Sequence, residues 1–447
     1  MADYAGAAGA MHTSRIVNRW VQLIAGIIAM MAIANLQYAW TLFTKPIQAH
    51  LHVSLVAVQG IFAAFILVET WLVPFEGALI DRIGPRFMLG MGGILVGLGW
   101  LGSGYAETLR SLYLWYMVGG IGAGFVYGGT IGNALKWFPD HRGLCVGLTA
   151  GAYGVGTALS VKPIDAMLKA SGYQHTFIVF GIIQGVLVLL AALFLAKPPA
   201  GWAPPNWKAK AAQVKARVNS SSVDMTPLQM VKSGSFWMIY FMMTLVAFGG
   251  LVVTAQINPM AVSYKVDKIV IFGGMTALVL AIEVDRILNG LTRPFWGWVS
   301  DHIGRENTMF IAFAAEALAV FALLQLIHRP LWFIVLSGLC FFAWGEIFSL
   351  FPSITGDLFG QKWATTNYGI VYTAKGTASL FAGPGAAWLF SKTGAWTKVF
   401  WIMIACDLVA ASLALLWLKP VARRTIAHAE ATLGEAVTAP GAIRGVA

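Results

Sequence analysis

The chain has 447 residues, of which 58% are hydrophobic and only 11% are charged, and its mean hydropathy is +0.73. Soluble globular proteins carry about 25% charged residues, so this composition excludes a soluble enzyme, a disordered regulator and a nucleic-acid-binding protein. We attribute the net charge of +11 to membrane topology, because most Lys and Arg residues fall in short gaps between apolar runs.

A helix that crosses a bilayer needs about 20 mainly apolar residues, and twelve stretches of the chain meet that length. They lie near residues 19–43, 54–80, 87–105, 109–135, 143–168, 174–196, 236–260, 269–299, 307–327, 331–357, 366–390 and 396–418. We therefore predict an all-α multi-pass membrane protein with twelve transmembrane helices. The polar head, residues 1–18, is followed by no cleavage signal, so we expect the first span to be retained.

One long polar stretch, residues 197–235, divides the predicted spans into six and six. The expected organisation is an N-terminal segment 1–18, a bundle 19–196, a linker 197–235, a second bundle 236–418 and a tail 419–447. If the N-terminus is cytoplasmic, the inside segments hold 18 Lys and Arg residues and the outside gaps hold 8. The positive-inside rule then places both termini in the cytoplasm, and we expect the inner membrane of a bacterial cell.

The two halves contain a repeated loop at an offset of 220 residues. Pro74–Arg86 reads PFEGALIDRIGPR after the second span, and Pro294–Glu306 reads PFWGWVSDHIGRE after the eighth. Internal repeats of this kind are typical of secondary transporters. The spacing Gly-x3-Asp-[Arg/Lys]-x-Gly-x-[Arg/Lys] resembles the signature of the major facilitator superfamily, which implies a 6+6 pseudo-symmetric fold.

Further segments resemble the oxalate:formate antiporter family within that superfamily. They are Gln37–Leu42, Trp137–Gly143, Asn289–Gly297, Trp344–Gly345 with Phe351–Ser353, and Ala374–Ser379. The resemblance implies exchange of small carboxylates such as oxalate and formate by alternating access.

The repeated loops place carboxylates where one helix ends and the next begins. A carboxylate there can accept from helix N-terminal amides or pair with a nearby arginine. We interpret the charged residues of these loops as a latch for the cytoplasmic helix ends, although tight turns with solvated charges would look the same. The latch set is Asp81, Arg82, Arg86, Asp301 and Arg305.

Two bases inside the predicted spans are candidates for an anion site. Lys375 stands about nine residues into its span, so ~14 Å deep at 1.5 Å per residue, and Arg293 lies in the eighth span. Burying a charge within a bilayer is energetically unfavourable, so such residues are candidates for functional sites. An arginine guanidinium can bind a carboxylate through two parallel hydrogen bonds. The family resemblance assigns both residues to the substrate. The alternative is that they pair structurally with Glu283, Asp285 or Glu346.

Aromatic side chains are expected to wall the same cavity. The resemblance favours Tyr38, Tyr127, Tyr153, Trp344 and Tyr372 together with Gln37, and Phe348 stands where tyrosine would be usual. Trp40 belongs to the same predicted set. A dry aromatic wall strengthens charge pairing, and tyrosine hydroxyls can donate to a carboxylate. Ordinary packing aromatics are the alternative.

Several acids inside the spans depart from the family pattern. Span eight carries Glu283, Asp285 and Arg286, and span ten carries Glu346. These acids could balance positive charge, accept protons or select another anion. We favour balance, with Glu283 paired to Arg286 three residues on. Other acids in the spans receive no role, among them Glu69, Glu316 and Asp407, and Lys162 is expected to pair with Asp165.

These features predict a secondary transporter of small carboxylates that exchanges one anion for another. Two cations ~8 Å apart at an effective dielectric of ~20 repel by ~2 kcal/mol, so an anion should ease closure of the cavity. The alternatives are a proton-coupled monocarboxylate symporter and, in another class, a membrane-embedded sensor. We expect a functional monomer in the lipid bilayer with no cofactor, metal, nucleotide or nucleic acid, because no catalytic pair, metal spacing or nucleotide loop is present.

Overall fold

A computed structural model describes residues 18–138, 142–199, 224–360 and 363–425, with residues 427 and 431. Within those ranges a few side chains lie outside the description. They belong to Asp81, Leu135, residues 142–144, Asp301, Ala364 and Thr365.

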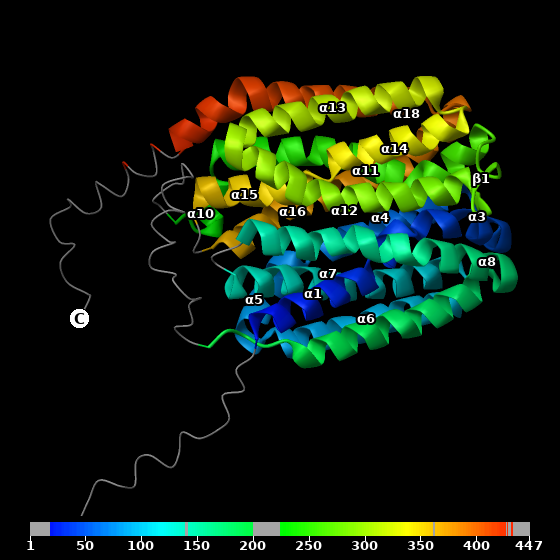
Figure 1. Cartoon of the computed structure of the whole chain (residues 1–447), viewed down its shortest axis with the longest axis horizontal. Coiled ribbons are helices and arrows are strands. Elements are labelled where there is room, and N and C mark those ends of the chain that lie inside the picture. Colours follow the sequence, from blue (N-terminus) through cyan, green and yellow to red (C-terminus); the bar gives the residue numbers. More distant parts are fainter. Residues whose placement is uncertain are drawn as a thin grey trace, which may run out of the picture.

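The N-terminal half is a set of helices that run along the long axis of the molecule (Figure 1). They are α1 (Arg19–Ile33), α2 (Asn35–Tyr38), α3 (Trp40–Leu51), α4 (Leu55–Trp71), α5 (Val73–Ile83), α6 (Pro85–Gly104), α7 (Leu109–Trp137) and α8 (Arg142–Phe194). α8 turns at Gly172, whose φ of 78° lies in the left-handed region, so it contains the predicted spans 143–168 and 174–196. α4 and α5 meet at a 42° bend.

The C-terminal half has the same character. Its elements are α10 (Pro227–Val231), α11 (Gly234–Ser263), β1 (Val270–Phe272), β2 (Met275–Thr276), α12 (Ala277–Ile303), α13 (Arg305–Leu326), α14 (Pro330–Trp344), α15 (Ile347–Phe359), α16 (Ala364–Leu380), η1 (Phe381–Gly385), α17 (Ala386–Thr393), α18 (Thr397–Leu413) and η2 (Ala414–Leu418). The predicted span 269–299 needs correction, because β1 and β2 form an antiparallel hairpin and the helix begins only at Ala277.

Apart from short breaks and that hairpin, all twelve predicted stretches are helical. Seven described helices, or eight if the bent pair α4–α5 counts as one span, are long and apolar enough to cross a membrane. α12 falls outside that group because it carries Glu283, Asp285, Arg286 and Arg293. α16 carries Lys375 among threonines and glycines. Hydropathy is therefore low in two helices that carry charges to the centre of the molecule.

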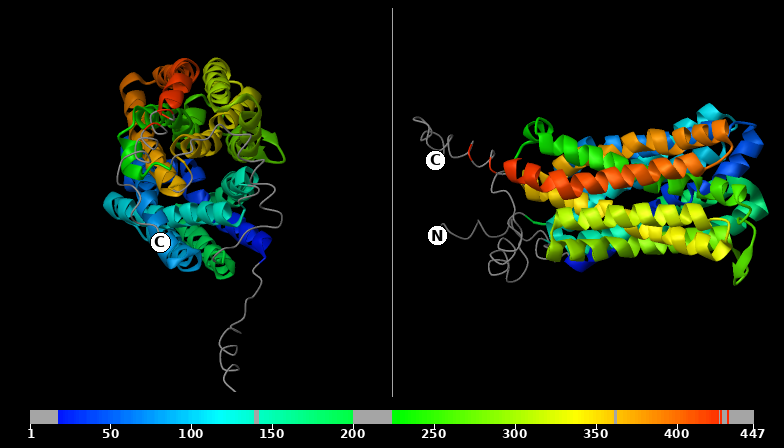
Figure 2. Two further views of the ribbon diagram at one scale, coloured as in Figure 1. Left: turned by 90° about the vertical axis from the view of Figure 1, so that its left-hand side faces the viewer. Right: turned by 90° about the horizontal axis from the view of Figure 1, so that it is seen from above.

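The two halves lie side by side, one at the top and one at the bottom of Figure 1, and the end-on view in Figure 2 separates them as well. The start of α1, the C-terminal end of α8, the short helix α10 and the end of η2 lie at one end of the molecule, called here the linker end. β1 lies at the opposite end, called here the hairpin end. The first described helix therefore begins, and the last one ends, on the same side of the molecule, as the predicted topology requires.

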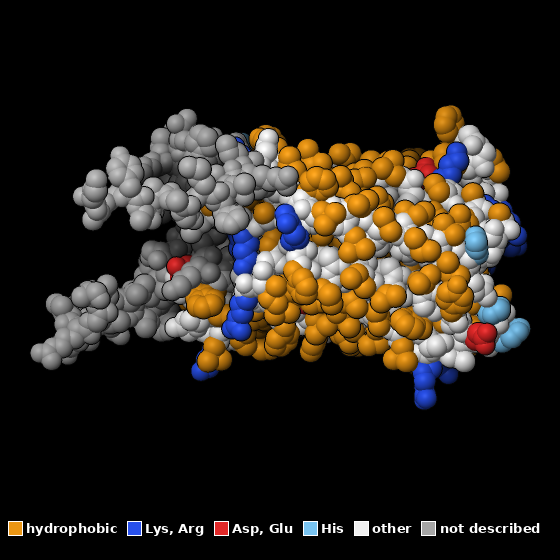
Figure 3. All heavy atoms as spheres, turned by 90° about the horizontal axis from the view of Figure 1, so that it is seen from below, with side chains coloured by type: hydrophobic (Ala, Val, Ile, Leu, Met, Phe, Trp, Pro, Cys, Tyr) orange, Lys and Arg blue, Asp and Glu red, His pale blue; other side chains and the backbone are white. Residues whose placement is uncertain are grey.

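The outer surface suits a lipid environment. Large apolar side chains such as Leu193, Trp237 and Leu318 are more than half exposed. In Figure 3 hydrophobic side chains cover the middle of the visible face, while Lys and Arg side chains gather toward its two ends. A broad exposed apolar band between charged ends is the surface of a protein that spans a bilayer.

Glycines let the halves approach backbone to backbone. A Cβ at Gly151 of α8 would lie 2.9 Å from the carbonyl oxygen of Gly290 on α12, and one at Gly154 would overlap the Arg286 carbonyl. On α7, a Cβ at Gly120 would lie 2.9 Å from the Phe65 carbonyl, whereas Gly132 faces open space. Gly120, Gly151 and Gly154 therefore allow neighbouring helices to pack closely, as small residues do in membrane proteins.

In the described part of the chain, several hydrogen bonds join the halves between the centre and the hairpin end. Gln59 Nε2 of α4 donates to Ala255 O at 2.7 Å and to Gln256 Oε1 at 3.2 Å on α11. Asn258 donates through its backbone and its side chain to Thr41 of α3, at 3.1 and 2.9 Å.

The predicted latch residues make contacts within each half. Arg305 Nε lies 3.2 Å from Asp357 Oδ2, and Arg86 Nε donates to Leu195 O at 3.1 Å. The backbone carbonyl of Arg82 accepts from Lys197 at 3.0 Å. The side chains of the other two latch candidates, Asp81 and Asp301, lie outside the described residues, so the latch stays a prediction.

Candidate substrate site

Arg293 of α12 and Lys375 of α16 meet at the centre of the molecule. Each is 1% exposed. Arg293 Cζ lies 4.2 Å and Lys375 Nζ 5.7 Å from the centroid of the same Phe348 ring. The structure therefore brings together the two bases that the sequence placed in one site.

Arg293 is held by both halves. Its Nη2 donates to Asn289 Oδ1 at 3.1 Å and to the Tyr38 hydroxyl at 3.4 Å, and its Nη1 donates to the Ala150 carbonyl. Tyr38 also donates to Asn289 Oδ1, at 2.9 Å. Sequence reasoning gave Asn289 no role. Its position one helical turn before Arg293, on the same face of α12, could have revealed it.

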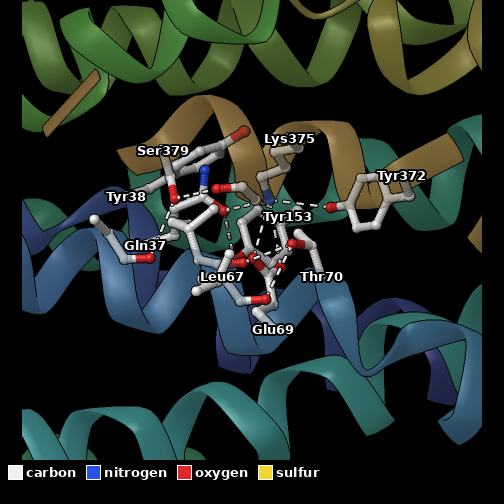
Figure 4. Close-up of polar contacts among 12 residues, drawn as sticks. Gln37, Tyr38, Leu67, Glu69, Thr70, Tyr153, Tyr372, Lys375 and Ser379 are labelled. Atoms are coloured by element: carbon white, nitrogen blue, oxygen red, sulfur yellow. Dashed lines mark hydrogen bonds and ion pairs between the residues drawn. The ribbon is translucent and has the colours of Figure 1, made fainter. Parts of the chain in front are cut away.

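Lys375 is held by an acid that the sequence did not assign. Its Nζ lies 3.0 and 3.4 Å from the two carboxylate oxygens of Glu69 on α4, and 3.0 Å from Gln37 Oε1 and from the Tyr372 hydroxyl. Figure 4 shows the amine directed at these groups. The alternative partners Glu283, Asp285 and Glu346 are therefore wrong for Lys375. Glu69 is unpaired within its own helix, and only the tertiary fold identifies its cation.

Most of the predicted aromatic wall surrounds this pair. Tyr127 stacks on Tyr372 with centroids 5.2 Å apart, and Tyr38 meets Tyr153 edge-on at 4.9 Å. The ring pairs Trp344–Phe348 and Phe348–Tyr372 continue the wall at 5.3 and 6.4 Å. The site is closed toward both ends, since these side chains are at most 5% exposed.

Trp40 lies apart from this wall. Its Nε1 donates to Gln59 Oε1 at 3.2 Å, and its ring packs on Tyr116 at 4.7 Å and Phe62 at 6.4 Å. Its described contacts are those of a packing residue. Through Gln59, Trp40 is connected with the hydrogen bonds that join the halves near the hairpin end.

The charges on α12 have other surroundings than the prediction gave them. Arg286 is fully buried between the rings of Tyr38 and Phe341, at 4.1 and 4.3 Å. The acid whose charge acts on it is Asp285, whereas Glu283 is half-buried and interacts with Lys162. The predicted pair of Glu283 with Arg286 is wrong, because Arg286 is enclosed by two aromatic rings and Glu283 interacts with Lys162 instead.

The expected pair of Lys162 with Asp165 also needs correction. Asp165 lies 2.6 Å from Lys169, four residues on and exposed. Lys162 instead interacts electrostatically with Glu283 of the other half. Local spacing on a helix offered two partners for Asp165, and the solvent-exposed one is used.

Glu346 does not belong to the central site. It is fully buried at the break between α14 and α15, where its electrostatic neighbours are Glu316 of α13 and Asp407 of α18. A Cβ at Gly249 would lie 3.1 Å from Glu316 Oε1 and 3.5 Å from Asp407 Oδ1. Glu316 and Asp407 are therefore neighbours inside the C-terminal half, and Glu346 cannot balance Lys375.

Comparisons with known proteins agree with this architecture. The sequence pattern of the Major Facilitator Superfamily matches residues 23–283 and 287–446. The chain is 34% identical over 406 residues to the oxalate:formate antiporter of Oxalobacter formigenes, which covers 90% of this chain and 92% of the relative. It is 27% identical to the uncharacterized MFS-type transporter YhjX of Escherichia coli K12, over 81% of this chain and 86% of the relative.

More distant matches include a mouse protein and a solved transporter structure. Monocarboxylate transporter 14 of Mus musculus is 23% identical over 74% of this chain and 76% of its own length. The xylose transporter XylE from E. coli, in a partially occluded inward-open conformation, superposes with a TM-score of 0.66 at 13% identity. That match covers 88% of this chain and 96% of XylE. At that identity it supports the fold alone.

Proposed function

The chain belongs to the major facilitator superfamily and, within it, to the oxalate:formate antiporter family, and we propose that it exchanges small carboxylate anions across the membrane. It is a multi-pass membrane transporter and not an enzyme. Oxalate and formate are the first candidate substrates, because they are the substrates named for the relative at 34% identity. The proposed location is a bacterial inner membrane, with both termini in the cytoplasm.

The observation that carries this proposal is the burial of two bases from one half against polar groups of the other. Arg293 contacts Tyr38 and Ala150, and Lys375 contacts Gln37 and Glu69. An anion bound here would touch both halves at once. Alternating access needs that arrangement, because the substrate must be released when the halves rock apart on either side.

The chemistry of the two bases fits a carboxylate. A guanidinium presents a planar fork that matches the two oxygens of a carboxylate, and an ammonium acts as a point charge. Both are removed from water and enclosed by aromatic rings. A small anion that supplies the missing charge is therefore bound more strongly than it would be at an exposed base.

Counterflow in proteoliposomes tests the proposal. Vesicles that contain the purified protein are loaded with unlabelled oxalate or formate, and uptake of the labelled anion is followed. We expect rapid uptake that depends on the internal anion, no measurable uptake with Arg293→Gln, and normal uptake with Arg329→Gln, which removes an exposed base elsewhere. Uptake that needs an inward pH gradient and ignores the internal anion would overturn exchange and favour the proton-coupled symporter.

A further inference from the structure

The two bases of the candidate site differ in how much of their bonding capacity is free. A lysine ammonium has three donors. Lys375 uses them on Glu69, Gln37 and Tyr372, all at about 3.0 Å. The side chains of Lys375 and Glu69 are 2% and 1% exposed, so this is a dry ion pair that joins α16 of one half to α4 of the other. Lys375 therefore has no free donor left for a further anion.

Arg293 and its neighbours do have free donors. Within the described residues, Arg293 Nε, Asn289 Nδ2 and Gln37 Nε2 have no hydrogen-bond partner, although all three side chains are at most 1% exposed. The oxygens of the two amides are engaged, Asn289 Oδ1 by Arg293 and Gln37 Oε1 by Lys375. Buried donors without acceptors are unfavourable. The free Nε of Arg293, with a free donor on Asn289 beside it and another on Gln37 beside Lys375, points to an anion as the missing partner.

The charges at the centre set the charge of that anion. Arg293 and Lys375 contribute two positive charges, and Glu69 removes one of them. Arg286 and Asp285 add one positive and one negative charge, and within the described residues neither charged group has a hydrogen-bond partner. Glu76 is an electrostatic neighbour of Glu69, and its ionised form would add a further negative charge. The three bases and the acids Glu69 and Asp285 together leave one positive charge at most for a ligand.

We propose that Glu69 sets the substrate charge of this transporter, so that the site takes monocarboxylates in preference to dicarboxylates. This rests on the proposed function, since it assumes that carboxylates bind beside Arg293. A monocarboxylate can accept from Arg293, Asn289 and Gln37 while the Glu69–Lys375 pair stays intact. A dicarboxylate that reaches for Lys375 must displace Glu69, which leaves a buried carboxylate with no cation.

Binding measurements on the purified protein test this inference, with formate and acetate compared against oxalate and malonate. We expect the wild type to bind the monocarboxylates at least tenfold more tightly than the dicarboxylates. Glu69→Gln keeps the length of the side chain but removes its charge. It should free the charge of Lys375 and shift the ratio of the two dissociation constants at least tenfold toward dicarboxylates.

Glu316→Gln is the matched control. It neutralises another acid that is 1% exposed, but one that lies with Asp407 and away from Lys375. It should leave the ratio unchanged. If Glu69→Gln does not fold, Glu69→Asp keeps the charge and should keep the preference. Competition of each anion against counterflow by the wild type then measures that preference without any variant.

The possible results separate the two proposals. A wild type that binds dicarboxylates as tightly as monocarboxylates overturns the inference and leaves exchange intact. A monocarboxylate preference that Glu69→Gln does not alter overturns the role of Glu69. A wild type that binds no carboxylate, or binds it equally well after Arg293→Gln, overturns the proposed function itself.

Discussion

Replacing Lys375 by glutamine should destabilise the protein because it leaves Glu69 as a buried carboxylate without a cation. The two side chains are 2% and 1% exposed and 3.0 Å apart. Removing one partner of a buried ion pair costs about 3–5 kcal/mol, because the remaining charge is left uncompensated in a medium of low dielectric. Lys375→Gln should therefore lower the stability of the protein as well as its transport activity.

The double variant Glu69→Gln with Lys375→Gln isolates that cause. It removes both charges and leaves two amides that can bond to each other, to Gln37 and to Tyr372. Contacting pairs show coupling energies of about 0.5–3 kcal/mol, and for a pair so deeply buried we expect the upper part of that range. The double variant should therefore be clearly more stable than Lys375→Gln.

Thermal unfolding in detergent, followed by tryptophan fluorescence, measures these differences, and the chain has 18 tryptophans as reporters. Lys392→Gln, which removes an exposed base near the end of α17, serves as the control and should unfold at the wild-type temperature. A double variant that is no more stable than Lys375→Gln would refute the reasoning. It would mean that the ion pair is not what makes the lysine essential to the fold.

Three further predictions follow from the described contacts. Arg293→Lys keeps the charge but loses the fork, so titration calorimetry should show carboxylate binding at least tenfold weaker, and binding as tight as in the wild type would contradict the site. Asp285→Asn should lower the unfolding temperature more than Glu283→Gln, since Asp285 acts on the fully buried Arg286; equal effects would count against that pairing. Gly151→Leu should hinder closure of the halves, because a Cβ at this position would already lie 2.9 Å from the backbone of α12 and overpacking costs about 1–3 kcal/mol. An unfolding temperature and a transport rate equal to those of the wild type would exclude a tight contact at that position.

The sequence predicts the helices well because their signals are local. A run of about 20 apolar residues spans a bilayer whatever its neighbours do, and the repeated loop identifies the two halves without any tertiary information. The same reasoning places Arg293 and Lys375 together through the family resemblance. The hairpin before α12 was missed because Val270–Phe272 is as apolar as the start of a span.

The partners of the buried charges could not be predicted in this way. Spacing along one helix suggests Glu283 for Arg286, but the side chain of Glu283 interacts with Lys162 on the other half. The cation beside Glu69 is 306 residues away in the chain. Such pairings depend on how the two bundles face each other, and neither composition nor periodicity carries that information.

The hydrogen bonds between the halves bear on how the carrier opens toward the hairpin end. Toward the hairpin end, separation of α3 and α4 from α11 must break the four bonds made by Gln59 and Asn258, each with a net value of about 0.5–1.5 kcal/mol. Water that enters the opening cavity can take over the freed amide and carbonyl groups. Opening at the hairpin end and wetting of the site should therefore occur together.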